Sequence, residues 1–160
     1  GFEDGLFNAW RNDKSFVLND PTYATASILV AGPRFGVGSS REHAVWALRE
    51  FGFRAVIAPG FGAIFASNCL RNGILPLVLG EAQIAAIADW VAGCPPHNRV
   101  LIDLPAQQVQ AGGQVYPFEI EPGARRMLVE GLDAIALTQT RRDVIAAFHQ
   151  RRRELRPWLY

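Results

Sequence analysis

The residues best suited to chemistry lie in one glycine-rich stretch that leads into an expected helix. The stretch reads Gly32-Pro-Arg-Phe-Gly-Val-Gly-Ser-Ser-Arg-Glu-His43, and it follows an apolar run at residues 27–31. At the start of a helix, free backbone N–H groups and the positive end of the dipole point into the preceding loop. The sequence therefore predicts an anion-binding loop before a helix over residues 39–51.

The expected helix start has the spacing of a capping box. Ser39 and Glu42 are three residues apart, so each side chain is placed to accept a hydrogen bond from the backbone N–H of the other residue. Arg41 would then lie in the first turn, where the dipole disfavours a cation by about 0.3–1 kcal/mol. A bound carboxylate or phosphate facing the guanidinium would explain this residue, and so would a contact with a surface acid or with solvent.

Nucleotide-binding motifs do not fit the glycine spacing. The glycines at positions 32, 36 and 38 do not form G-x-G-x-x-G, and Ala58-Pro59 ends the next expected strand where a ribose-binding acid would stand. A lysine does not follow the glycines as in a Walker A loop. The loop therefore predicts a site for a small carboxylated or phosphorylated molecule.

Ser39 has two possible roles in such a loop. The G-x-S-x-G elbow of serine hydrolases is absent, because Ser39 is followed by Ser40 and Arg41. Ser39 either caps the helix or acts as a base in its alkoxide form, whose charge the helix start and Arg41 would favour. The residue pattern alone leaves both roles open.

Composition limits the class of protein. The chain has 160 residues, enough for one domain with a core, and a formal net charge of +1, which gives no reason to expect nucleic acid or a membrane surface. Its two cysteines, Cys69 and Cys94, are too few for an iron–sulfur cluster, and its three histidines show no zinc spacing. We expect no metal site in this chain, and two free thiols fit the reducing cytoplasm.

The order of the expected elements predicts an α/β fold with mixed strand directions. Apolar runs predict buried strands at 27–31 and 54–58, and an Ala-Gly-Gly turn joins two later strands at 107–110 and 114–120. Residues 133–137 read as extended, and Thr140 reads as the cap of a last helix with Val144, Ile145 and Phe148 facing inward. The remaining expected elements are helices at 62–71, 80–91 and 124–130, an extended segment at 74–79 and a strand at 100–104.

Several runs resemble a known family. The run Phe35-Gly-Val-Gly-Ser-Ser-Arg-Glu-His-Ala44 resembles the signature of the swivelling domain of the aconitase superfamily. The runs Gly52-Phe-Arg-Ala-Val-Ile-Ala-Pro59 and Glu130-Gly-Leu-Asp133 are similar to the small subunits of 3-isopropylmalate dehydratase (isopropylmalate isomerase). The resemblance covers nearly the whole chain. It implies an aconitase-type swivelling β/β/α domain over residues 1–160, with a mixed sheet flanked by helices.

The family reaction is the isomerisation of 2-isopropylmalate and 3-isopropylmalate through isopropylmaleate, in leucine biosynthesis. The resemblance implies a cytoplasmic hydro-lyase that is active only with a large subunit. That subunit would carry a [4Fe–4S] cluster whose iron acts as a Lewis acid, so that this chain has no cofactor of its own. The implied partners are the large subunit and the isopropylmalate substrate, with no nucleic acid and no membrane.

The resemblance also assigns roles within the glycine-rich stretch. Ser39 would be the base that removes the carbon-bound proton, and Ser40 and Arg41 would bind a substrate carboxylate. The residues that would support the loop and the helix start are Gly36, Gly38, Glu42 and His43.

Two features depart from the family pattern. Small subunits usually carry an N-terminal strand and a substrate loop with an Asn-x-Asp-Thr-Asp-x-Ile-Ile-Pro run, and we expect residues 1–160 to lack both. Arg34 stands where the family usually has Asn or Asp. Two alternatives stay open: the small subunit of a related hydro-lyase, such as homoaconitase or a methylmalate/citraconate isomerase, and a non-catalytic carboxylate-binding module.

Overall fold

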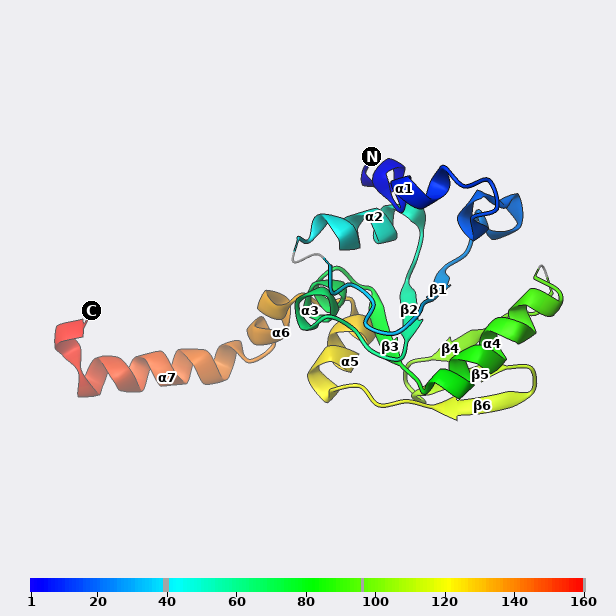
Figure 1. Cartoon of the computed structure of the whole chain (residues 1–160). Coiled ribbons are helices and arrows are strands. Elements are labelled where there is room, and N and C mark those ends of the chain that lie inside the picture. The colour runs from blue at the N-terminus through cyan, green and yellow to red at the C-terminus, as the bar shows by residue number, and fades with distance from the viewer. Residues whose placement is uncertain (39–40, 96, 160) are drawn as a thin grey trace.

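Two three-stranded sheets form the centre of the computed structural model (Figure 1), which describes residues 1–38, 41–95 and 97–159. The parallel sheet has the order β1-β2-β3, with strands Ile28–Val30, Ala55–Ala58 and Leu75–Val78. The antiparallel sheet has the order β4-β5-β6, with strands Leu101–Asp103, Gln108–Ala111 and Gln114–Pro117. The predicted α/β fold with mixed strand directions is confirmed, and the two directions are divided between two sheets.

Helices surround the parallel sheet and extend beyond it toward the C-terminus (Figure 1). The α-helices are α1 (Asn8–Arg11), α2 (His43–Phe51), α3 (Ala63–Arg71), α4 (Glu81–Gly93), α5 (Pro122–Glu130), α6 (Ala134–Gln139) and α7 (Arg142–Leu155). Short 3-10 turns are η1 (Phe2–Gly5), η2 (Val17–Asn19), η3 (Pro21–Tyr23) and η4 (Pro157–Leu159).

Strand β2 divides the core into two layers. Its residues are all buried, and successive side chains point to opposite faces of the sheet. Val56 therefore joins the cluster under α2 and the N-terminal turns, whereas Ala55 and Ile57 join the cluster that includes α4 and the antiparallel sheet. The prediction of a buried strand is confirmed for β2. Strand β1 is only half-buried, so the prediction of a buried strand at 27–31 is wrong in its burial.

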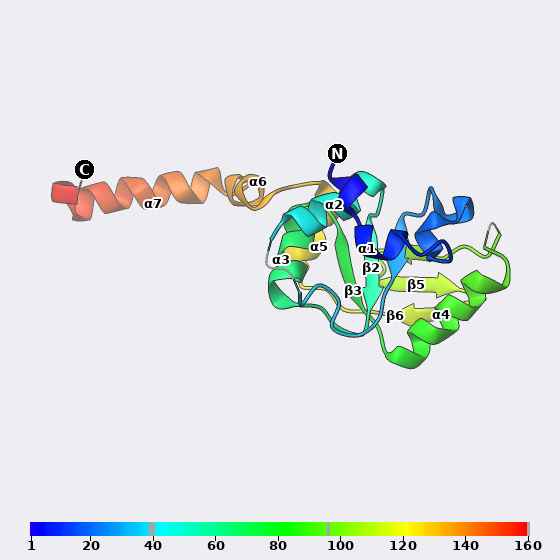
Figure 2. The same ribbon diagram turned by 45° about the horizontal axis from the view of Figure 1, so that its top comes forward.

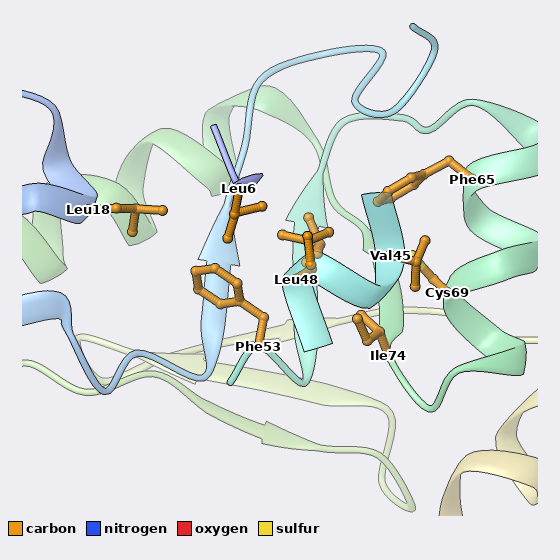
Figure 3. Packing of buried hydrophobic residues seen from close by; sticks show 10 residues of the cluster. Leu6, Leu18, Val45, Leu48, Phe53, Phe65, Cys69 and Ile74 are labelled. Carbon is orange, nitrogen blue, oxygen red and sulfur yellow. The ribbon is translucent and has the colours of Figure 1, made fainter. Parts of the chain in front are cut away.

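The first cluster fixes the position of α2 above the parallel sheet (Figure 3). Val45 and Leu48 of α2 are buried there together with Phe65 and Cys69 of α3. Leu6 from the N-terminal segment is buried in the same cluster, so this segment is anchored to the body. The packing holds the starts of α2 and α3 in a fixed relation to the sheet.

The antiparallel sheet contains the predicted glycine turn. Gly112 and Gly113 have φ values of +58° and +76°, and the flanking residues Ala111 and Gln114 pair with each other. Positive φ at both central residues is the requirement of a type I′ turn, whose twist matches that of a hairpin. The prediction of a hairpin is confirmed.

The C-terminal region differs from the prediction in two places. Residues 134–139 form α6 and are not extended, because Asp133 caps this helix by accepting a hydrogen bond from the Ala136 N–H at 2.6 Å. Thr140 ends α6, and its hydroxyl donates to the Leu137 carbonyl at 2.7 Å. It therefore does not cap the last helix, which begins at Arg142.

Helix α7 projects away from the two sheets (Figure 2). Val144, Ile145 and Phe148 were predicted to face inward, but all three are exposed. The spacing of these residues correctly predicted that the helix has an apolar face. Spacing within one helix cannot predict whether another element covers that face.

Candidate functional site

The glycine-rich loop leaves β1 and runs beside the connection from β2 to α3. The Ala31 N–H donates to the Ile57 carbonyl at 2.8 Å, and the Phe35 N–H donates to the Gly60 carbonyl at 3.0 Å. The Gly62 N–H in turn donates to the Phe35 carbonyl at 2.9 Å. These bonds hold the loop at the carboxyl end of the parallel strands, where α/β folds place their ligands.

Gly36 is the point of closest approach in this loop. Its φ is +75°, and a β-carbon added there would lie 2.7 Å from Cβ of Phe65 and closer still to the ring. A β-carbon on Gly62 would lie 2.8 Å from the Gly36 carbonyl oxygen. Only glycine satisfies both the backbone conformation and the available space at position 36. By contrast, no described atom lies within 4 Å of a β-carbon built on Gly38.

Arg34 also adopts a left-handed conformation, with φ of +57°. Asn and Asp adopt this conformation more readily than other residues with a side chain. The preference of the resembled family for Asn or Asp at this position thus has a backbone explanation. Arg34 is exposed, so its side chain is accommodated without displacing the core.

The start of α2 differs from the predicted one. Helix α2 begins at His43, and Glu42 occupies the N-cap position with helical backbone angles and no capping hydrogen bond from its side chain among the described residues. Its carboxylate instead accepts a hydrogen bond from the Asn72 side-chain amide at 2.7 Å. Ser39, the other half of the predicted box, and Ser40 lie outside the described residues. The prediction that the helix starts at residue 39 is therefore wrong.

Arg41 lies before the helix rather than in its first turn. It precedes the N-cap residue Glu42, and its carbonyl accepts a long hydrogen bond of 3.4 Å from the Ala44 N–H. The residue is exposed. The predicted conflict between Arg41 and the helix dipole depended on a place inside the first turn, so that prediction is wrong.

Asn72 joins the start of α2 to the end of α3. Its side-chain oxygen accepts from the Trp46 indole N–H at 3.1 Å, and its amide donates to Glu42 and to the Asn68 carbonyl at 2.9 Å. The sequence analysis expected a helix over residues 62–71 and assigned no role to the side chain of Asn72, which follows it. The side-chain role was missed, because the partners are 26 and 30 residues away in sequence.

His43 lies at the first position of α2 in an aromatic group. Its ring centroid is 4.8 Å from that of Trp46 and 5.4 Å from that of Phe2, in both cases with the rings tilted. These contacts connect the N-terminal turn η1 to the start of α2. Two of the four predicted supporting residues, Glu42 and His43, therefore make contacts that hold the start of α2 in place.

A hollow of about 300 Å³ opens beside the glycine-rich loop. The loop, the N-terminal segment, α2 and α3 enclose it with mostly apolar groups. Its lining residues are Gly5, Leu6, Phe7, Phe35, Gly36, Gly38, Ala44, Ala47, Leu48 and Phe65. Phe35 and Phe65 meet edge to face at 5.4 Å within this wall.

The cysteines of the sequence and the described side chains bear on the predicted absence of an iron–sulfur cluster. Residues 1–38, 41–95 and 97–159 contain no group of three His, Cys, Asp or Glu residues able to bind a metal. Cys69 is buried, and burial raises the pKa of its thiol to about 12, whereas Cys94 is exposed. Two separate thiols do not fit a cluster that requires three or four thiolates. The same described segments include no helix long and apolar enough to span a bilayer.

Comparisons with known proteins agree with this architecture. Residues 7–82 match the aconitase C-terminal domain. The 3-isopropylmalate dehydratase small subunit of Cupriavidus necator is 51% identical over 169 residues, which cover 100% of this chain and 81% of that protein. The protein of the same name from Salinispora tropica is 50% identical, with 98% and 80% covered. A crystal structure of 3-isopropylmalate dehydratase from Methanocaldococcus jannaschii is similar with a TM-score of 0.55 and 27% identity, over 75% of this chain and 67% of that one.

These findings define the chain as a protein of the aconitase C-terminal domain class, in which a loop at the carboxyl end of a parallel sheet leads into a helix. About half of the residues are identical to those of the two small subunits, over nearly the whole chain, and this identifies a family within the class. The chain belongs to the family of 3-isopropylmalate dehydratase small subunits. The resemblance noted from the sequence is confirmed.

Proposed function

We propose that this chain is the small subunit of a 3-isopropylmalate dehydratase and contributes its glycine-rich loop to an active site shared with a large subunit. The observation that carries the proposal is the identity of about half to small subunits of that name over at least 98% of the chain. Residues 1–160 would form one swivelling domain. The substrate would be 2-isopropylmalate or 3-isopropylmalate, interconverted through isopropylmaleate.

Ser39 is the proposed base. Its oxygen would take the proton from the carbon adjacent to the one that loses hydroxide, so that water is eliminated and a double bond forms. Return of the proton to the carbon that lost hydroxide, with addition of hydroxide to the carbon that lost the proton, would give the isomer. A serine can do this only as an alkoxide, and a helix that begins a few residues later, as α2 does at His43, would favour that charge through its dipole.

Arg41 and Ser40 are the proposed carboxylate ligands. A guanidinium presents a planar pair of N–H donors that matches a carboxylate. Arg41 is exposed directly before α2, where a substrate can reach it from outside the domain. Glu42 and His43 would keep this segment in place through Asn72 and Trp46.

The apolar hollow supports isopropylmalate over a homoaconitase substrate. It is bordered by Gly38 and lined by aromatic and aliphatic groups such as Phe35 and Leu48. A branched aliphatic group gains free energy on leaving water for such a surface, whereas the third carboxylate of a homoaconitase substrate would lose hydration there. We therefore propose that this hollow favours the isopropyl substituent.

The large subunit would carry the [4Fe–4S] cluster, because the residues of this chain do not fit one. Activity would then require both subunits. The two free cysteines fit a reducing compartment, and we propose the cytoplasm.

The test is reconstitution of the full chain with a cluster-loaded large subunit, assayed on a panel of substrates. We expect kcat/KM for 3-isopropylmalate to exceed that for methylmalate and for homoaconitate at least tenfold. A preference for either of the other two would assign the chain to a related hydro-lyase. Carboxylate binding without turnover of any of them would assign it to a non-catalytic module.

A further inference from the structure

The side chain of Asn72 lies between the end of α3 and the start of α2. Asn72 is the C-cap residue of α3 and stands between two fully buried residues, Cys69 and Ile74. It is half-buried, and its backbone N–H donates to the carbonyls of Asn68 and Cys69 at 3.1 Å. Asn72 is therefore a fixed point from which a side chain can hold a neighbouring segment.

The partners of this side chain determine which way its amide points. The Trp46 indole has an N–H donor and no acceptor, so it takes the oxygen of the Asn72 amide, at 3.1 Å. A carboxylate only accepts hydrogen bonds, so Glu42 takes the NH2 group of the amide, at 2.7 Å. An amide at position 72 serves both partners at once. A carboxylate at this position would satisfy Trp46 but would repel Glu42.

Glu42 connects this contact to Arg41, the proposed carboxylate ligand. The two residues are adjacent, so their Cα atoms lie about 3.8 Å apart. The backbone bond from the Ala44 N–H to the Arg41 carbonyl is long, at 3.4 Å, and does little to fix Arg41. The carboxylate of Glu42 makes no capping bond within α2 among the described residues, and it contacts Asn72 on α3 instead. The position of Arg41 therefore depends on a contact between two helices.

We propose that Asn72 is a positioning residue for substrate binding, which acts through Glu42 to hold Arg41 where it meets a substrate carboxylate. This inference rests on the proposed function, in which Arg41 binds that carboxylate. Asn72 itself does not touch the substrate. An interaction with a carboxylate that takes no part in bond breaking is present both in the bound substrate and in the transition state. Its loss raises KM and leaves kcat nearly unchanged.

The first test exchanges the amide for a carboxylate of the same shape. Asn72→Asp keeps an acceptor for the Trp46 indole and removes the donor to Glu42. The variant chain is assayed in the complete complex with the large subunit. We expect KM for 3-isopropylmalate to rise at least tenfold and kcat to stay within threefold of the unchanged complex.

Asn98 provides a matched control. It is also half-buried, and its side-chain amide donates to the Trp90 carbonyl at 2.7 Å, in the last turn of α4. Figures 1 and 2 show α3 and α4 on opposite sides of the parallel sheet. Asn98→Asp loses a hydrogen bond and gains a charge as Asn72→Asp does, and we expect its KM to stay within threefold of the unchanged complex. An equal rise of KM in both variants would overturn the proposal.

A swap of the two groups distinguishes positioning of Arg41 from a purely structural role in α3. When Asn72→Asp and Glu42→Gln are combined, the new amide can donate to the new carboxylate, and the net charge is unchanged. We expect KM of this pair to return to within threefold of the unchanged complex. Glu42→Gln alone keeps an acceptor for Asn72 and should also change KM less than threefold.

Stability gives the contrasting readout. The bond from the Asn72 amide to the Asn68 carbonyl, 2.9 Å long, stays broken in the pair, so its thermal midpoint should not recover fully. If Asn72 served only to end α3, KM would be as high in the pair as in Asn72→Asp. That result would overturn the proposal.

The proposed function and this inference fail on different results. If the unchanged complex turns over methylmalate or homoaconitate in place of isopropylmalate, the proposed function is wrong, and the same pattern of KM is expected on that substrate. If it turns over none of them, the variants are compared by the Kd for 3-isopropylmalate, measured by calorimetry. A Kd that does not rise in Asn72→Asp would then overturn the inference, as would an unchanged complex that does not bind.

Discussion

Gly36 is the residue at which the loop of the candidate site has the least freedom. Its backbone is left-handed, which strains any residue with a side chain, and a β-carbon there would collide with the Phe65 side chain. We expect Gly36→Ala to lower the free energy of unfolding by about 2–4 kcal/mol, as overpacking and backbone strain add. Chemical denaturation measures this change. Gly32→Ala is the control, because nothing described lies within 4 Å of a β-carbon there, and a loss as large as that of Gly36→Ala would contradict the steric explanation.

At the residue scale, the sequence predicted which residues matter better than it predicted the contacts that they make. The need for glycine at position 36 was foreseen from the loop motif, although the side chain that requires it, Phe65, is distant in sequence. Glu42 was predicted to bind the backbone of residue 39, but among the described residues its carboxylate accepts a hydrogen bond from the side chain of Asn72. Local spacing offers a side chain a partner but does not exclude a better one from far away in the sequence.

At the scale of elements, Asn72 couples α2 to α3, and a double-mutant cycle measures this coupling. Glu42→Ala and Asn72→Ala should each reduce stability, and the pair should lose less than the sum of the two. Each single variant removes the same half-buried hydrogen bond to the Glu42 carboxylate, and the double variant loses it only once. We therefore expect an interaction energy of about 0.5–2 kcal/mol. Additive losses would show that the two side chains act independently.

The element predictions were accurate where the signal lies in residues close in sequence. The continuous apolar run of β2 and the hairpin at Gly112-Gly113 were predicted correctly, because each follows from residues close in sequence. The region after Asp133 was predicted wrongly. Asp133 caps α6 and Thr140 ends it, whereas the sequence analysis expected one last helix that begins at Thr140. Capping residues mark a helix boundary without telling which helix they belong to.

At the scale of the whole molecule, Cys69 reports the opening of the core. Its thiol is buried with a pKa of about 12, so a thiol reagent near neutral pH should modify Cys94 at once and Cys69 only on unfolding. In the Cys94→Ala variant, only the slow modification of Cys69 should remain. Rapid modification of Cys69 in that variant would contradict the packing around α2 and α3.

The same thiol affects stability at high pH. Between its unfolded value near 9 and its folded value of about 12, the unfolded chain loses the proton and the folded chain keeps it. The contribution of Cys69 to stability is therefore complete below pH 9 and falls by about 1.4 kcal/mol for each pH unit above it. Denaturation at pH 8 and pH 10 should show this loss, and Cys69→Ala should remove it.

The domain should not depend on α7 for its own stability. Deleting residues 141–160 removes no buried residue among those described, so we expect the thermal midpoint to change by less than about 2 °C. A large fall in the midpoint would show that α7 packs against the body.

The central claim is that the loop supplies the base of a shared active site, and the direct measurement is kcat for Ser39→Ala in the complete complex. We predict a fall of about 10²–10⁴-fold, the typical contribution of a general base, with the Kd for the large subunit unchanged. Ser40→Ala, at the neighbouring position, should act mainly by raising KM. A kcat for Ser39→Ala within threefold of the unchanged complex would contradict the account.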